Sequence, residues 1–128
     1  MKLLLDTHVA LWALVGDRRL NPAATKLIAD PNNQVYVSAV SVWEIAIKHA
    51  LGRSGIPFPA TEALRYFEEA GYSFLNISPE HAATVEQLSL IHNDPFDRML
   101  VAQSITEPLR LMTHDATVAR YSDTVISI

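Results

Sequence analysis

Four of the fourteen acidic residues stand where carboxylates often do chemistry. Asp6 and Asp115 each come just after a short apolar run, and Glu44 and Asp97 fall in the first turns of two expected helices. Carboxylates that gather without enough cations either share protons or hold a metal ion. With oxygen ligands alone, that ion is a hard one. The four acids therefore predict a Mg²⁺ or Mn²⁺ site.

Glu44, Asp97 and Asp115 also have structural explanations, whereas Asp6 is the hardest to explain in this way. Ser41 and Glu44 have the spacing of a capping box, and Asp115 is suited to cap a short helix. Asp94 precedes a proline and caps the next helix, where the helix dipole favours Asp97. Two carboxylates about 5 Å apart cost roughly 3 kcal/mol at an effective dielectric of 20. Any one acid alone favours the structural explanation, but four acids that converge on one place favour a functional site.

Other polar residues surround these acids. Thr7 and Thr113 flank them, and their hydroxyls either orient a metal-bound water or a ligand carboxylate, or cap helices. Lys48, one helical turn after Glu44, and Arg98, beside Asp97, are the expected neutralising cations.

The five histidines lack the spacing of a zinc site such as His-Glu-x-x-His. His81 is expected on a helix surface. The other four are expected near the acidic edge, where they are candidates for substrate contact: His8, His49, His92 and His114.

Short apolar runs alternate with helical patterns along the chain. Strands are expected at residues 3–5, 35–37, 72–77, 109–112 and 125–128. Helices are expected at residues 8–15, 22–30, 41–51, 61–70, 78–90 and 94–105, with Asn21, Thr61 and Ser78 among their caps. This alternation predicts a three-layer α/β/α sandwich with a central, mainly parallel sheet. The four acids should meet at its carboxyl edge, the usual ligand site, and the helix over 78–90 should cross the end of the sheet obliquely.

Composition narrows the class of protein. The 128 residues suit one domain, and the absence of Cys excludes disulfides and thiolate zinc sites. No apolar run approaches the roughly 20 residues of a membrane span, and no signal peptide is apparent, so we expect a cytoplasmic protein. The net charge of −4 and the lack of basic blocks argue against a phosphate-gripping duplex binder. A carboxylate-bound ion would neutralise a scissile phosphate instead.

The acids lie within four motifs that occur in a familiar order. They are Leu-Leu-Asp-Thr-His at 4–8, Ser-Ala-Val-Ser-Val-Trp-Glu-Ile at 38–45, Asp-Pro-Phe-Asp-Arg-Met-Leu-Val-Ala-Gln at 94–103 and Thr-His-Asp at 113–115. Together they resemble a PIN-domain ribonuclease of the VapC toxin type, over essentially the whole chain. The resemblance implies a single PIN-like domain at residues 1–128.

The resemblance also assigns roles. It implies catalytic Asp6, Glu44, Asp97 and Asp115, with Mg²⁺ or Mn²⁺ bound chiefly by Asp6 and Asp97 and further by Asp115. Glu44 would hold a water or a second ion. The implied activity is endonucleolytic cleavage of RNA, with transfer RNA among the candidate substrates. The implied partners are a cognate antitoxin and a second copy, in a homodimer or a toxin–antitoxin hetero-oligomer.

Two other functions remain open. A receiver domain also uses Mg²⁺ and acids at a sheet edge, but it needs a lysine after a late strand, and lysines occur only at positions 2, 26 and 48. A non-catalytic PIN-like interaction module would keep the fold without turnover. The helix around Trp12 is apolar on most faces, which predicts a surface covered by an antitoxin or a second copy.

Overall fold

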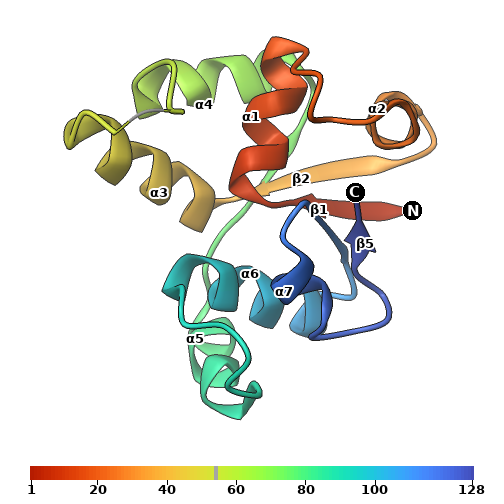
Figure 1. Cartoon of the computed structure of the whole chain (residues 1–128), viewed down its shortest axis with the longest axis vertical. Coiled ribbons are helices and arrows are strands. Elements are labelled where there is room, and N and C mark those ends of the chain that lie inside the picture. Colours follow the sequence, from red (N-terminus) through yellow and green to blue (C-terminus); the bar gives the residue numbers. More distant parts are fainter. Residues whose placement is uncertain (54) are drawn as a thin grey trace.

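Five parallel strands form one sheet in the computed structural model, which describes residues 1–53 and 55–128 (Figure 1). The strands are β1 (Lys2–Leu5), β2 (Gln34–Ser38), β3 (Ser73–Leu75), β4 (Arg110–Thr113) and β5 (Ile126–Ser127). Their order is β3-β2-β1-β4-β5, so β1 is central. The chain adds strands on one side of β1 and then on the other, which places the reversal of strand order at β1 and β4.

The helices cover both faces of the sheet, as the α/β prediction requires. They are α1 (Thr7–Val15), α2 (Pro22–Ala29), α3 (Ala39–Ala50), α4 (Ala60–Glu69), α5 (Pro79–Thr84), the 3₁₀ turn η1 (Val85–Gln87), α6 (Pro95–Thr106) and α7 (Ala116–Ala119). Figure 1 shows α1, α2 and α4 on one side of the strands, and α5, α6 and α7 on the other.

Side-chain alternation along the strands divides the core into two halves. Leu3 and Leu5 of β1 pack with α1, whereas Leu4 packs with α6, and all three side chains are fully buried. Successive residues of a strand point to opposite faces, so a strand that is apolar at every position needs cover on both sides. The two core halves hold the sheet rigid where its carboxyl edge carries the acids.

Most helix ends follow local sequence signals. Asn21 caps α2 and Ser78 caps α5, each with Pro at the next position, as expected. Gly16 ends α1 in the left-handed conformation at φ 66°, which glycine adopts without steric cost. The prediction of Thr61 as a cap is wrong: α4 begins at Ala60, and Pro59 occupies the cap position without a side-chain hydrogen bond.

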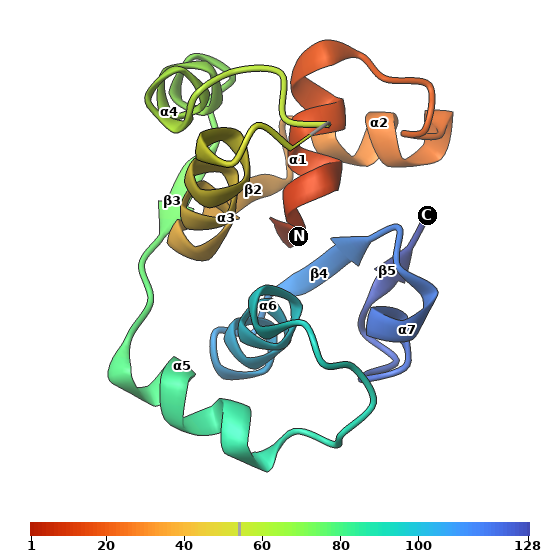
Figure 2. The ribbon, with the colours of Figure 1, turned by 60° about the vertical axis from the view of Figure 1, so that its left-hand side comes forward.

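The helix expected over residues 78–90 is shorter and lies elsewhere. Its α-helical part ends at Thr84, and η1 follows it. Figure 2 shows α5 beyond α6, away from the strands, instead of across the end of the sheet. By packing against α6, this segment returns the chain to the carboxyl edge, so that α6 can begin there.

The helix around Trp12 is covered by its own chain. Val9, Ala10, Leu11 and Trp12 are buried in the core half formed with α2 and α4, and Trp12 is 8% exposed. This intramolecular burial accounts for the apolar residues of α1 from Val9 to Trp12, whereas Val15 at the end of the helix is exposed. The prediction of a partner surface at Trp12 therefore loses its support from Trp12 itself.

Within the described part of the chain, the structure contains no helix with the length and hydropathy required to cross a membrane.

Candidate active site

Asp6 lies at the carboxyl end of the central strand, in the first position after β1. Its Oδ1 accepts a hydrogen bond from the backbone N–H of Val9 at 2.8 Å, so Asp6 caps α1. Its Oδ2 accepts a 2.5 Å hydrogen bond from the hydroxyl of Thr113, which ends the neighbouring strand β4. Burial raises the pKa of the Asp6 carboxyl, and these two hydrogen bonds oppose that rise.

Asp97 lies in the first turn of α6, where Asp94 caps the helix through the N–H groups of Phe96 and Asp97. The pKa of Asp97 is raised to about 7. Burial is the main cause, followed by the negative charges of Asp94 and Asp6, whereas His92 lowers the pKa and Glu44 adds a smaller increase. The pKa of Asp97 therefore responds to the cap of its own helix and to acids from two other segments of the chain.

Asp115 follows β4 and caps α7 through the N–H groups of Thr117 and Val118. Its Oδ2 lies 3.0 Å from Nε2 of His92, which also lies 3.2 Å from Oδ2 of Asp97. Burial raises the pKa of Asp115, but the hydrogen bond from His92 and those from the cap outweigh it, so the pKa is lowered. His92 thus joins two of the predicted acids.

Glu44 lies on α3, with both carboxylate oxygens occupied. Oε1 is 2.6 Å from the hydroxyl of Thr7, and Oε2 pairs with the ammonium of Lys48 at 2.5 Å. The predicted capping box is wrong, because α3 begins at Ala39 and its cap is Ser38. Ser41 lies inside the helix, and its hydroxyl is 2.9 Å from that of Thr7. Glu44 is therefore buried because it binds Thr7 and Lys48, and it does not cap a helix.

The four predicted acids line one cavity of about 510 Å³ at the carboxyl edge of the sheet. The other side chains that line it are Thr7, His8, Trp12, Arg19, Lys48, His92, Asp94 and His114. Thr113 lies beneath this set, fully buried and bonded to Asp6. The expected cation Lys48 is in place, whereas Arg98 donates to the carbonyl oxygens of Val85 and Ser89 instead of to an acid.

The histidines divide differently from the expectation. His8, His92 and His114 line the cavity, but His49 is exposed in the last turn of α3 and is not part of the lining. The prediction of a surface position for His81 is wrong: it is 1% exposed, and its ring binds the N–H of Ser78 and the carboxylate of Glu107. The reciprocal bonds of the Ser78 cap draw this ring inward, which helical spacing alone does not reveal.

The donor set indicates which ligands a metal ion would find here. One atom each of His92, Asp97 and Asp115 lie within 4.8 Å of one another. Nδ1 of His92 accepts the N–H of Asp94 at 3.0 Å, so Nε2 carries the proton of the neutral ring and donates it to Asp115. A protonated nitrogen cannot ligate a metal. The remaining donors of this group are the carboxylate oxygens of Asp97 and Asp115, which fit Mg²⁺ or Mn²⁺.

A family model and a known relative both match most of this chain. The model of the PIN domain matches residues 3–123. Ribonuclease VapC22 of Mycobacterium tuberculosis is 34% identical over 113 residues, which cover 88% of this chain and 85% of that protein.

Solved structures share the fold at low sequence identity. A VapBC2 complex from Rickettsia felis, bound to a DNA fragment from its promoter, matches with a TM-score of 0.72 at 16% identity, over 100% of this chain and 98% of that chain. VapBC-1 from nontypeable Haemophilus influenzae matches with a TM-score of 0.66 at 18% identity, over 100% and 97% of the two chains.

Proposed function

This chain belongs to the PIN-domain family, and from that premise we propose that it is a VapC-type ribonuclease. In this proposal it hydrolyses phosphodiester bonds of RNA with a divalent ion and acts as the toxin of a toxin–antitoxin pair. The name of its curated relative supports the ribonuclease activity, and the fold that it shares with a toxin–antitoxin complex from Klebsiella pneumoniae supports the toxin role.

One observation carries the proposal: four acids from separate segments line one cavity, where burial and neighbouring charges act on Asp97. Burial and the charges of Asp94, Asp6 and Glu44 raise the pKa of Asp97 to about 7. Repulsion of this kind works against the stability of the fold, and such perturbed groups gather at functional sites. The cluster of acids therefore supports a site built for a positive ligand.

Asp6, Asp97 and Asp115 are the residues that would hold Mg²⁺ or Mn²⁺. When bound, the ion supplies Lewis-acid polarisation of a phosphoryl oxygen and neutralises its charge. This reconciles the formal net charge of −4 with a nucleic-acid substrate, because no basic face is needed at the scissile phosphate.

The surrounding side chains hold the acids in place. Thr113 and the N–H of Val9 fix the two oxygens of Asp6. The N–H of His92 donates to Asp115, and the same nitrogen lies 3.2 Å from Asp97. A carboxylate accepts about four hydrogen bonds. Glu44 therefore keeps acceptor sites after binding Thr7 and Lys48, and with these it orients the attacking water.

The proposal extends to partners and setting. The whole chain, residues 1–128, acts as a single PIN-like domain in the cytoplasm, where a cognate antitoxin inhibits it. It forms a homodimer or a toxin–antitoxin hetero-oligomer, in line with the complexes that share its fold. Light scattering of the chain with and without its antitoxin measures these assemblies, and a clean monomer in both samples would contradict them.

Cleavage of structured RNA, including transfer RNA, tests the activity. Purified protein is incubated with Mg²⁺, with Mn²⁺ or with chelator, and the products are resolved on denaturing gels. Cleavage with either ion and none with chelator is expected. Asp6→Asn and Asp97→Asn should each abolish cleavage while the circular dichroism spectrum stays unchanged.

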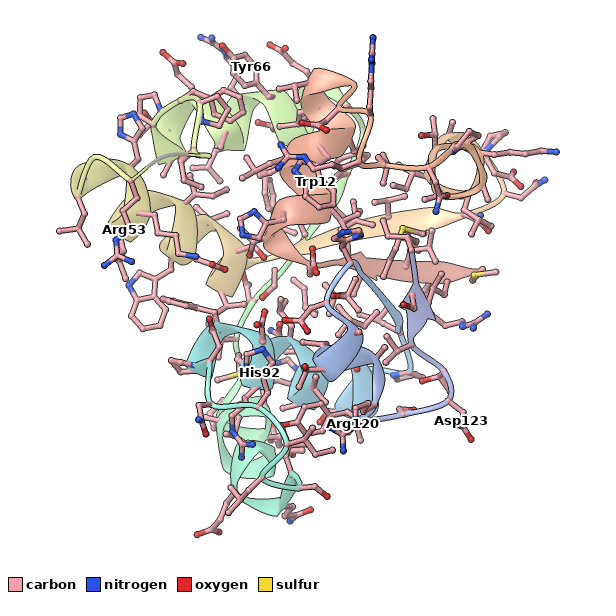
Figure 3. The ribbon with its side chains drawn as sticks, viewed as in Figure 1. Trp12, Arg53, Tyr66, His92, Arg120 and Asp123 are labelled. Carbon is pink, nitrogen blue, oxygen red and sulfur yellow. The ribbon has the colours of Figure 1, made fainter. Side chains whose placement is uncertain are left out.

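Asp123→Asn is the matched control, because it makes the same chemical change at an exposed acid outside the cavity lining (Figure 3). It should cut RNA as fast as the original protein. If Asp6→Asn and Asp97→Asn cut equally fast as well, the assignment of the site is wrong. A folded protein that cuts no RNA with either ion would instead favour the non-catalytic interaction module.

A further inference from the structure

The charges that line the cavity are poorly matched to a strand of RNA. Five carboxylates line it, and an ion held by some of them neutralises only the phosphate that it touches. The neighbouring phosphates of the strand need cations of their own. Among the described lining residues, Lys48 and Arg19 are the two permanently charged cations, and Lys48 is paired with Glu44 inside the cavity. Of these two cations, Arg19 is the one that is not paired with a carboxylate of the cavity.

Arg19 is paired with an acid that does not line this cavity. Its Nε and Nη2 donate to the two oxygens of Asp17 at 3.0 and 2.7 Å, and its backbone N–H donates to Oδ1 of Asp17 at 2.9 Å. The pairing lowers the pKa of Asp17 to about 2, chiefly through the side-chain hydrogen bond from Arg19. A guanidinium has five N–H donors. Asp17 accepts two of these N–H groups, which leaves the other three for a ligand.

A second contact places this guanidinium over an aromatic ring. Its Cζ lies 4.8 Å from the centroid of the Trp12 ring, and Trp12 is itself almost buried. The edge of the same ring meets His114, whose centroid is 5.1 Å away. His114 adjoins Thr113, the residue that donates to Asp6. Arg19 is thus connected to the proposed ion ligand Asp6 through the rings of Trp12 and His114 and the end of β4.

The stacked residues lie on the same opening as the acids. Figure 3 shows Trp12 on α1 and His92 before α6, on opposite sides of the centre of the molecule, and both line the cavity. Arg19 lies beside Trp12 in this lining. Because the acids and Arg19 line the same cavity, a strand that brings one phosphate to the acids lies along an opening that this guanidinium also borders.

We propose that Arg19 binds a backbone phosphate of the RNA next to the one that is cut. This inference rests on the proposed function. Arginine binds phosphate through two parallel N–H groups, and a guanidinium already held by Asp17 and Trp12 loses little freedom when it does so. The contact is to the backbone, so it sets the position of the strand and carries no preference for a base.

A charge-matched pair of variants tests the proposal. Arg19→Gln and Arg18→Gln each remove one positive charge from adjacent, exposed positions, but Arg18 is not part of the cavity lining. Binding of a fluorescein-labelled single-stranded RNA is measured by anisotropy in chelator at several salt concentrations. Cleavage of the same RNA is measured with Mg²⁺. Melting temperatures confirm that both variants are folded.

Arg19→Gln should weaken RNA binding about three- to tenfold and reduce the slope of log affinity against log salt by about 0.7, the value for one phosphate of a single strand. In cleavage, KM should rise with little change in kcat. Arg18→Gln should change the affinity less than about twofold. Equal effects of the two variants would overturn the proposal, since the charge would then act only through the general field.

Two further outcomes are distinguishable. If Arg19→Gln leaves RNA binding unchanged but weakens binding of poly-glutamate, the residue serves an acidic protein ligand and the proposal is wrong. If the unaltered protein neither binds nor cuts RNA, the proposed function fails, and this inference fails with it. Cleavage by the unaltered protein with no difference between Arg18→Gln and Arg19→Gln overturns this inference alone.

Discussion

The hydroxyl of Thr113 donates a 2.5 Å hydrogen bond to Asp6, across 107 positions of the sequence. The two residues meet because β1 and β4 are neighbouring parallel strands that end at the same edge. The same hydroxyl accepts the backbone N–H of Asp115 at 3.0 Å. One buried side chain therefore orients two of the proposed ion ligands.

Replacing Thr113 with Val removes the hydroxyl and keeps the shape. Asp6 then loses a hydrogen bond in a buried place, and the N–H of Asp115 loses its acceptor. Thr113→Val should lower the free energy of unfolding by about 1–3 kcal/mol. It should also slow RNA cleavage. Urea unfolding and cleavage rates measure both effects, with the exposed Thr61→Val as control. Stability unchanged in Thr113→Val would contradict the account of this bond.

The raised pKa of Asp97 makes stability depend on pH. The folded pKa is about 7 and the reference value is 3.8, so between them the folded protein binds the proton more tightly than the unfolded chain does. In chelator, stability should therefore fall as pH rises from about 4 through about 7, by on the order of 3 kcal/mol from this group.

Asp97→Asn removes this dependence and isolates it from that of other groups. The variant should be more stable than the original protein at pH 8 in chelator, and the difference should shrink towards pH 4. Urea unfolding at pH 4.5, 6, 7 and 8 measures the difference. Two parallel curves would show that Asp97 does not carry the shift.

A divalent ion should compete with the proton on Asp97. Mg²⁺ or Mn²⁺ at about 100 times its Kd adds about 2.7 kcal/mol of stability, which raises the melting temperature by several degrees. The rise should be larger at pH 8 than at pH 6, since the ligand must be ionised. Thermal unfolding measures it. Asp123→Asn should respond fully and Asp97→Asn should not; an equal response in both would place the ion elsewhere.

His92 is expected to act on the ion through Asp97 and Asp115. His92→Leu removes the N–H that Asp115 accepts and that lies 3.2 Å from Asp97, and loss of such a supporting contact typically weakens metal binding by about 10- to 100-fold. His92→Gln keeps an N–H donor and should recover part of the affinity. Titration of Mn²⁺ followed by electron paramagnetic resonance measures both variants. Affinity unaffected by His92→Leu would remove His92 from the site.

Much of this arrangement follows from local rules. A short run in which every residue is apolar predicts a buried parallel strand. An acid directly after such a run, such as Asp6, must lie at the carboxyl edge of the sheet. Pro after Asn21, Ser78 or Asp94 marks three helix starts. These signals are short-range, so one sequence is enough to read them.

What the sequence does not reveal comes mostly from contacts between distant segments. His92 lies at the acidic edge as expected, but its contacts with Asp97 and Asp115 depend on a loop whose backbone N–H donates to Tyr121, 29 residues away. His81 is drawn inward by Ser78 and Glu107 together. Ser38 and Ser41 are both good caps, and tertiary packing decides between them in favour of Ser38. Arg19 carries no motif, and only the stacking on Trp12 brings it to notice.

Asp6 and Asp115 each start a helix as well as facing the cavity. Asparagine caps helices about as well as aspartate does, whereas alanine costs typically about 1 kcal/mol at such a position. Asparagine at both positions would therefore disarm the protein and leave its scaffold intact. Under the proposed function, such an inert copy is the form to produce in growing cells and to use as bait for the RNA substrate.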